Sequence, residues 1–338
     1  MYRRIILSLS LLFVAAAAQA ADHLLYFEAQ GIAGYSTAVK RAVFYSMNPD
    51  AEMQKPSLGF DFLKRFSGET GDFATVALQA RLALSEDNPA EKPYDSTENP
   101  GKYRLEPQIY NAYLKVKTPV AYVWAGHNRP AFGLSSYFDS HGLIMRTLAI
   151  QGFGYDRDWG GGLYRDFSWG DVSASVTTGS GMPVYAKGNY MTAARVSYGV
   201  QSQDNFNLGF SVGYGKTLDT MGYRLRDPEP LMMKMAGLDL TVLRNNLEHR
   251  LDFYVGTWLD KSTLAMSYRF GINVDQEGRL KLEAQPSYWK FGDEEDYQLA
   301  FCASSQITSN LTARVGYTYD HILNDSTVIF QLYYYLPI

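Results

Sequence analysis

Apolar and polar side chains alternate along most of this chain. The stretch from 264 to 273 shows the pattern clearly, with Leu264, Met266, Tyr268, Phe270 and Ile272 interleaved by Ala265, Ser267, Arg269, Gly271 and Asn273. Successive side chains of a β-strand point to opposite faces, so a period of two predicts strands that are apolar on one face and polar on the other. The chain is therefore expected to be all-β.

Sixteen segments with this alternation are predicted as strands. Most have close to the 9–11 residues that a tilted membrane strand needs. The sixth and seventh are the weakest, because Trp159-Gly160-Gly161-Gly162 has no clear face, so fourteen or eighteen strands stay open. The sixteen spans are 24–35, 56–67, 73–84, 106–117, 119–127, 155–166, 171–179, 189–200, 206–216, 233–243, 248–258, 262–273, 279–290, 297–307, 311–321 and 326–337.

The connections between these segments alternate in length. Even-numbered segments end in short turns such as Gly68-Glu69-Thr70-Gly71-Asp72 and Arg244-Asn245-Asn246, which are rich in turn-forming residues. Most odd-numbered segments end in longer connections, until the asymmetry fades toward the C-terminus. These longer connections are 36–55, 85–105, 128–154, 180–188 and 217–232. Long loops on one side and short turns on the other are typical of an outer-membrane barrel, whose even strand count leaves both termini on the periplasmic side.

The N-terminal residues predict export from the cytoplasm. Met1-Tyr2-Arg3-Arg4 is a short basic start, an apolar run follows from Ile5 to Ala18, and Ala18-Gln19-Ala20 is a small-x-small cleavage site. This order is that of a signal peptide, and the run is too short and too rich in alanine for a membrane anchor. We therefore expect a cleaved signal peptide over residues 1–20 and a barrel over residues 21–338. Loss of Arg3 and Arg4 takes the net charge from −4 to −6.

Composition agrees with a membrane barrel. Hydrophobic residues make up 46% of the chain yet never form a long block after the leader, and the 26 tyrosines supply the aromatic girdles of such a barrel. A soluble β-sandwich would also alternate, but it should not carry an apolar face on nearly every strand. Hydrocarbon leaves no backbone polar group unpaired, so a sheet in a membrane must close. We predict a transmembrane, antiparallel, up-and-down β-barrel of about sixteen strands in the bacterial outer membrane.

The final segment supports assembly in that membrane. Its alternating apolar face resembles the C-terminal signal that the barrel-assembly machinery reads, and that machinery is a predicted partner during biogenesis. The signal usually ends in an aromatic residue, whereas this chain ends Pro337-Ile338. The face consists of Val328, Phe330, Leu332, Tyr334, Leu336 and Ile338.

The third long connection carries a resemblance to a known family. It begins Gly126-His127-Asn128-Arg129-Pro130-Ala131-Phe132-Gly133-Leu134, which resembles the Gly-x-x-x-x-Pro-Phe-Gly-Leu stretch of the porin O/P-type family, the phosphate-selective porins and their relatives. Ala131 stands between the proline and the phenylalanine, so the motif is not intact. The resemblance implies a sixteen-stranded, trimeric pore whose third loop folds inward. The family's phosphate-binding residues cannot be placed here, so phosphate selectivity does not carry over.

Charged residues of that third loop are candidates for a pore constriction, with an ordinary solvated loop surface as the alternative. These candidates are Arg129, Asp139, His141 and Arg146. A sixteen-stranded barrel leaves an aqueous channel, so the implied function is passive diffusion of small hydrophilic solutes and ions between the two sides of a lipid membrane.

The polar faces of the clear strands predict which charges line the interior. Nine basic residues against six acidic ones favour a weak anion preference, because fixed charges in a narrow lumen select counter-ions. Pairing of these charges across the lumen, with no selectivity, is the alternative. The basic members are Arg65, Arg81, Lys115, Lys117, Arg195, Arg250, Arg269, Lys281 and Arg314, and the acidic members are Glu28, Asp61, Asp239, Asp252, Glu283 and Asp320.

Other chemistry finds little support. Cys302, the one cysteine, is assigned to the lumen side, excludes an internal disulfide and belongs to no zinc-like spacing. Ser140-His141 is the one Ser–His neighbour pair, and adjacent residues on an extended strand point to opposite faces, so no catalytic residue, cofactor or metal site is predicted. Scattered basic residues give no support to nucleic-acid binding. Two alternatives to a pore stay open: a barrel that sheathes a partner such as a cytochrome electron conduit, and a barrel enzyme.

Overall fold

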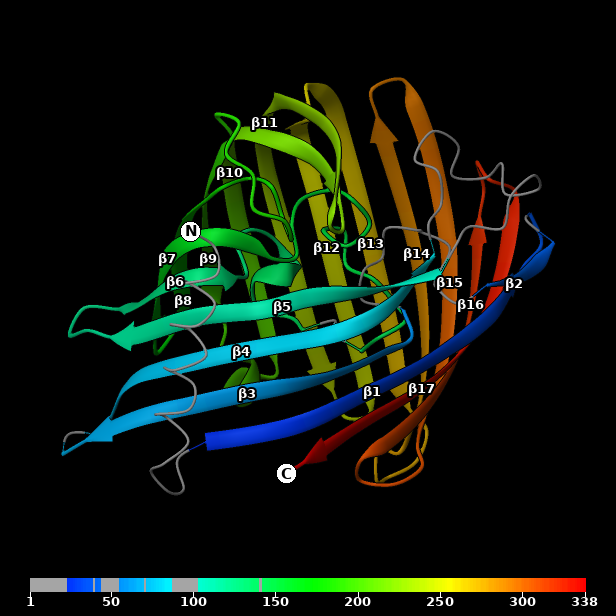
Figure 1. Cartoon of the computed structure of the whole chain (residues 1–338), viewed down its shortest axis with the longest axis horizontal. Helices are drawn as coiled ribbons and strands as arrows, with labels where there is room; N and C mark the ends of the chain where they lie inside the picture. The colour runs from blue at the N-terminus through cyan, green and yellow to red at the C-terminus, as the bar shows by residue number, and fades with distance from the viewer. Residues whose placement is uncertain (1–22, 39, 44–54, 70, 87–102, 140–141) are drawn as a thin grey trace.

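The computed structural model describes residues 23–338 except 39, 44–54, 70, 87–102 and 140–141. Within these ranges the chain is one antiparallel sheet that closes on itself, because β1 pairs with β17 as well as with β3 (Figure 1). The strands are β1 (His23–Ser36), β2 (Arg41–Val43), β3 (Ser57–Gly68), β4 (Gly71–Glu86), β5 (Tyr103–Lys117), β6 (Tyr122–Asn128), β7 (Asp158–Phe167), β8 (Gly170–Thr177), β9 (Tyr190–Tyr198), β10 (Phe206–Met221), β11 (Arg224–Arg244), β12 (Leu247–Trp258), β13 (Lys261–Asn273), β14 (Leu280–Phe291), β15 (Glu294–Gln306), β16 (Leu311–Asp320) and β17 (Asp325–Pro337).

The sheet contains seventeen strands, of which β2 has only three residues and extends the pairing of β1. The other sixteen coincide with the sixteen predicted segments, so the predicted barrel and its strand number are confirmed. Two short helices also occur in the described ranges, the 3-10 turn η1 (Leu134–Ser136) and α2 (Gln201–Asp204). No helix in the described part of the chain is long and apolar enough to cross a membrane. The predicted signal peptide lies outside the described residues.

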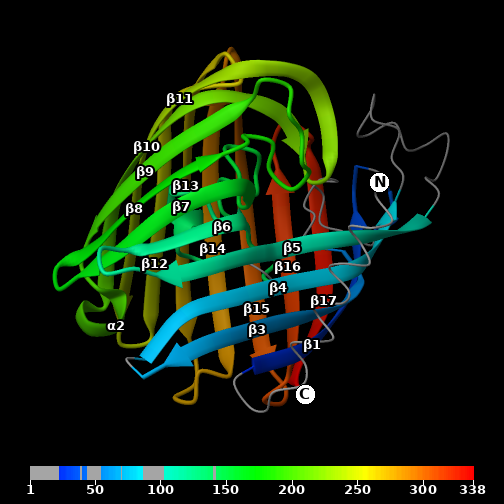
Figure 2. The same cartoon turned by 60° about the vertical axis from the view of Figure 1, so that its left-hand side comes forward.

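One predicted loop was wrong. Residues 217–232 are almost entirely strand, because β10 and β11 continue as a long hairpin that turns at Gly222 and Tyr223. Asp227-Pro228-Glu229-Pro230 reads as a loop in the sequence, since proline lacks the N–H that a ladder needs. The hairpin bends over the mouth of the barrel (Figures 1 and 2), and the Tyr223 hydroxyl at its tip donates to the Ile109 carbonyl of β5 at 2.7 Å. There the chain tolerates the prolines and an irregular register between Thr217 and Thr220.

The two faces of the wall follow the alternation in the sequence. In β13, Met266 on the outer face is 41% exposed while Arg269 on the inner face is 4% exposed. Leu282 of β14 and Val315 of β16, both on the outer face, are similarly exposed, which matches an apolar band that lipid would cover. Inner positions are buried although many are polar, because a loop and other inner side chains fill much of the interior.

Aromatic side chains gather at the strand ends near the short turns. Phe167 stacks on Trp169 across the turn between β7 and β8, with ring centroids 5.1 Å apart. Phe66 and Phe73 lie close together between β3 and β4, with tilted rings whose centroids are 6.4 Å apart. Such pairs at the rim form the aromatic girdle that marks a membrane–water interface.

Two neighbouring substitutions in β14 test the assignment of faces. Leu282→Asp places a charge on the outer face and should destabilise the assembled barrel by about 2 kcal/mol, somewhat less than the roughly 2–4 kcal/mol of a basic residue at mid-membrane. Lys281→Ala should leave a folded barrel, because Lys281 points inward, where its ammonium lies 3.0 Å from Glu283. The folded fraction in isolated membranes, measured by heat-modifiable electrophoretic mobility, checks both, and the reverse ranking would show that the register is wrong.

Candidate pore constriction

The connection between β6 and β7 spans residues 129–157, and its described residues, 129–139 and 142–157, fold into the barrel instead of projecting from it. Its early part is held by three backbone N–H groups that donate to inner side chains: Ala131 to Ser175 Oγ (3.0 Å), Gly133 to Ser211 Oγ (3.1 Å) and Leu134 to Asp252 Oδ1 (3.2 Å). These acceptors lie on β8, β10 and β12. We call this connection the inner loop, and Figure 2 shows it within the ring of strands.

The later part of the inner loop contacts inner residues of strands farther along the wall. Gln285 on β14 donates to the carbonyl of Arg146 at 2.8 Å, and Arg314 on β16 donates to the carbonyl of Gly142 at 2.7 Å. The loop therefore lies against the inner wall from β8 to β16 and narrows the lumen. This is the inward fold that the resemblance implied.

An apolar cluster fixes the loop to the wall. Phe132 packs on Tyr254 of β12 with centroids 4.9 Å apart, and Tyr155 meets Trp258 at 5.4 Å. Phe132, Leu148 and Tyr155 belong to one buried cluster with inward residues of β9, β11, β12 and β13. Burial of such side chains contributes roughly 1.5–3 kcal/mol each, so the loop is part of the folded core.

Gly133 is required where the loop turns past β12. Its φ is +63°, and a Cβ at this position would lie 1.9 Å from the hydroxyl of Tyr254. Any larger residue would meet both a strained backbone and a collision. The glycine of the partial Pro-Ala-Phe-Gly motif is therefore the residue that lets the loop approach the wall.

Basic residues of the wall hold the next turn of the loop. The guanidinium of Arg195 lies 4.6 Å from the ring centroid of Tyr137, and that of Arg250 lies 3.8 Å from the ring of Phe138. Burial raises the pKa of the Tyr137 phenol, and the Asp239 carboxylate raises it further, so this hydroxyl keeps its proton beside Thr241. Cation–π contacts of this kind contribute about 0.5–2 kcal/mol each.

A cluster of charges occupies the two ends of the inner loop. Arg129 pairs with Asp139 at 2.7 Å, and Arg157 lies 3.6 Å from the other oxygen of Asp139 and 3.0 Å from Asp156. Tyr110 of β5 donates to Asp156 at 2.8 Å and lies under the Arg157 guanidinium, 4.2 Å from the ring centroid. Arg157 is buried, whereas the Asp139 side chain is 52% exposed.

Arg157 keeps its charge in this buried place. Burial by itself would lower the pKa of Arg157, but the carboxylates of Asp156 and Asp139, together with Tyr110, outweigh it and raise the pKa above its usual value. The guanidinium therefore acts as a permanent cation that holds the two ends of the loop to β5.

The structure brings together two of the four predicted constriction residues. Arg129 and Asp139 belong to the cluster just described. Arg146 lies apart from it and is 7% exposed, and its backbone carbonyl accepts a hydrogen bond from β14. His141 and its neighbour Ser140 lie outside the described residues. Asp156, Arg157 and Tyr110 were not predicted, because in the sequence Asp156 and Arg157 read as the start of a strand. Their adjacency at the end of the long connection was the available signal.

The fifteen predicted lumen charges alternate with the exposed apolar side chains of their strands, and many have partners. Arg195 forms a two-pronged contact with Asp239 at 2.7 and 3.0 Å, and Lys281 lies within 3.1 Å of Glu248. Other inner charges meet polar groups: Arg81 meets Gln108, Glu28 meets Gln79, Arg269 meets Gln285, Arg314 meets Gln331, Asp61 meets Tyr335 and Asp320 meets Gln298. Among the described residues, Arg65, Lys115 and Lys117 lie within ion-pair distance of no carboxylate. Whether this set lines a conducting pore stays a prediction.

No three His, Cys, Asp or Glu side chains in the described ranges are grouped as a metal site would require. Cys302 is buried on the inner face of β15, the side that was predicted for it. Burial thus keeps this thiol from solvent.

The fold is a closed sixteen-stranded β-barrel with an inward-folded loop, and comparison with solved structures finds the same fold in bacterial porins. The chain superposes on OmpF of Salmonella typhi, solved with daunomycin, with a TM-score of 0.67 at 11% identity over 93% of this chain and 97% of that one. An anion-selective porin from Comamonas acidovorans gives 0.61 at 9% identity over 94% and 99%. A loop L8 deletion mutant of OmpT, an outer-membrane protein of Vibrio cholerae, gives 0.61 at 12% over 93% and 100%.

At these identities the likeness is one of fold. No protein-family model matches the chain, and no curated protein matches it in sequence. The fold is that of bacterial outer-membrane barrels, in agreement with the predicted location.

Substitution of Gly133 tests the anchoring of the inner loop. Gly133→Ala should destabilise the loop by at least about 1–2 kcal/mol, because alanine is strained at positive φ and its Cβ meets Tyr254. Faster amide hydrogen exchange over residues 131–138 is the expected observation. Gly31→Ala on β1 is the control, since a Cβ there meets nothing within 4 Å. Equal exchange in both variants would contradict the anchoring role of Gly133.

Proposed function

We propose that this protein is an outer-membrane porin through which small hydrophilic solutes and ions diffuse passively. The observation that carries the proposal is the inner loop, which narrows the lumen of a closed sixteen-stranded barrel along β8 to β16. Among the described residues, no separate domain seals the two mouths of the barrel. Barrels of this strand number are wide enough for an aqueous channel. Residues 1–20 would be the cleaved leader, and the short turns would face the periplasm.

A mild preference for anions follows from how the inner charges are partnered. Arg195, Arg250 and Lys281 each lie beside a carboxylate and add little net field to the lumen. Lys115 and Lys117, together with Arg65, have no such partner in the described part of the chain. The basic residues that can attract anions in the lumen are therefore fewer than the count of nine against six suggests, and they lie in one part of the wall.

The resemblance to the porin O/P-type family bears on both the assembly and the type of porin. A trimer of this chain is the expected assembly, and one solved OmpT structure with the same fold is a trimer form. Membership of the O/P type is supported by the Pro-Ala-Phe-Gly stretch, whose phenylalanine and glycine anchor the inner loop.

A barrel that sheathes a partner protein is less well supported by the geometry. The inner loop and its apolar cluster occupy the space along β8 to β16 that such a partner would need. No observation on the described residues favours an enzyme.

Single-channel recording tests the porin function. The purified, refolded barrel in a planar bilayer under a salt gradient should show open steps and a reversal potential on the anion side. Open steps with a cation-side potential would keep the porin and overturn the charge argument. Absence of conductance from a demonstrably folded barrel would contradict the proposed function.

The charge pair of the inner loop offers a second test in the same recording. Arg129→Gln leaves the half-exposed Asp139 with less compensation and should shift the reversal potential toward cations. Asp139→Asn should shift it toward anions, because Arg129 and Arg157 then lose their shared carboxylate. Opposite shifts of the two variants are the expected result, and unchanged potentials in both would place the pair outside the ion path.

A further inference from the structure

We infer that the barrel has an anion-binding vestibule at its short-turn mouth, apart from the inner loop, formed by Arg65, Lys115 and Lys117. Its ligands would be small solutes with two or more carboxylate or phosphate groups. The inference deepens the proposed porin function, on which it rests, by naming a class of solute and the place where it is held.

The strand register places these side chains together. Arg65 on β3 pairs with Thr75 on β4, and Thr75 pairs with Lys115 on β5, so the three lie in one row across the inner wall. Neighbours in such a row have Cβ atoms roughly 5 Å apart. Lys117 lies one inner position nearer the turn and pairs with Tyr122 on β6, next to Tyr164 on β7.

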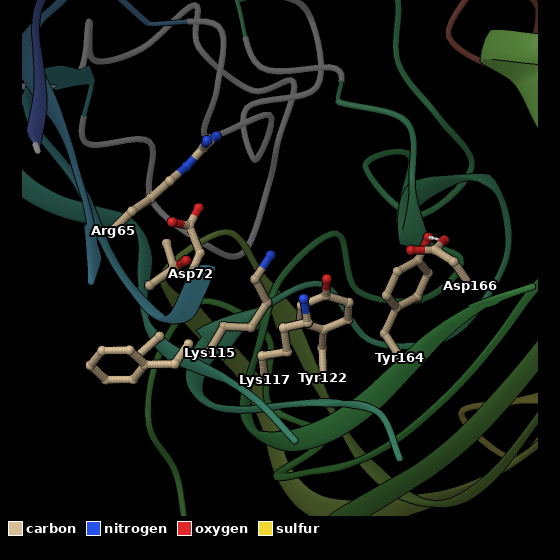
Figure 3. A pocket seen from close by; sticks show the side chains of 10 residues that line it. Arg65, Asp72, Lys115, Lys117, Tyr122, Tyr164 and Asp166 are labelled. Carbon is tan, nitrogen blue, oxygen red and sulfur yellow. Dashed lines mark hydrogen bonds between the residues drawn. The ribbon is translucent and has the colours of Figure 1, made fainter. Parts of the chain in front are cut away.

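The row borders a cavity of about 440 Å³ that also contacts Asp72 and Asp166. Figure 3 shows the side chains of Arg65, Lys115 and Lys117 on the same side of the sheet, with Tyr122 beside the lysines. The volume suits a small organic anion, which ligand sites commonly enclose in 300–1,000 Å³.

The two carboxylates at the cavity do not pair with its three basic side chains, which stay available to bind an anion. Asp72 accepts a hydrogen bond from Ser67, and Asp166 accepts one from Tyr164. Neither carboxylate lies within 4.0 Å of a cation of the row, and no other described carboxylate does. Lys115 and Lys117 instead lie over the ring of Tyr122, at 5.5 and 6.0 Å from its centroid.

This arrangement favours ligands with more than one negative charge. An arginine and two lysines spread along the wall can each meet a separate anionic group, while the hydroxyl groups of Thr75 and Tyr122 supply hydrogen bonds between them. A low-dielectric wall strengthens the attraction, and the exposed Arg65 and Lys117 keep the site open to exchange. Binding should therefore be weak and salt-sensitive, as a site on a diffusion path requires.

Current block by citrate is the direct test, with the whole folded barrel in a planar bilayer at about 0.1 M salt. Citrate should reduce the current in a saturable way, more strongly when added on the short-turn side, whereas acetate and glucose at equal concentration should not. The triple variant R65Q/K115Q/K117Q should weaken the citrate block about tenfold, because each exposed charge contributes a modest share.

Lys64→Gln is the matched control, since Lys64 has the same charge at the same height of β3 but lies on the outer face, over Phe66. It should keep the wild-type block. Equal block in the triple variant and the wild type would overturn the vestibule, and so would loss of block in K64Q alone. Should the triple variant fail to fold, the exposed K117Q by itself should still weaken the block by roughly twofold.

The two proposals fail in different ways. Titration calorimetry of the folded barrel in detergent measures citrate binding without any conductance. Binding that depends on Arg65, Lys115 and Lys117 in a barrel that does not conduct would keep the vestibule and reject the porin. Conductance without citrate binding would keep the porin and reject the vestibule.

Discussion

Closure of the sheet is the constraint on which the rest of the structure depends. Hydrocarbon offers no hydrogen-bond partner, so every backbone N–H and C=O within the membrane must be paired by a neighbouring strand. The pairing of β1 with β17 meets this demand by joining two segments at opposite ends of the chain, over eleven residue pairs from Tyr26–Pro337 to Ser36–Thr327. Once the sheet is closed, period-two alternation separates an apolar outer face from a polar interior, and the interior becomes available for the inner loop.

The interior is stabilised by polar groups that need one another. Asp239 and Asp252 lie directly opposite on β11 and β12, an arrangement of like charges that would be unfavourable alone. Arg195 compensates Asp239, and the backbone N–H of Leu134 compensates Asp252. The inner loop thus supplies a partner that the wall lacks, while the wall supplies acceptors for a segment that contains no strand in its described part. This mutual dependence explains how a connection of nearly thirty residues can be part of the core.

The inner charges fall into two groups according to their partners. Arg195, Arg250 and Arg269 contact aromatic residues of the inner loop or carboxylates of the wall, so these partners take up much of their charge. The row of Arg65, Lys115 and Lys117 lies where the inner loop does not reach, next to a cavity at the short-turn mouth (Figure 3). A polar interior position therefore does not by itself predict an influence on ions, because the partner decides it.

The sequence by itself determined the strands, their faces and the wiring, since alternation and turn chemistry are local properties of neighbouring residues. It also pointed to Arg129, Asp139 and the glycine of the third connection. It misjudged residues 217–232, where the prolines lie in the β10–β11 hairpin that bends over the barrel mouth. Only the tertiary structure decided that Tyr110 joins Asp156 and Arg157, and that Arg65 and Lys115 share a row across β4. Such contacts join residues that are tens of positions apart, so strand register and the path of the inner loop, which no local pattern encodes, determine them.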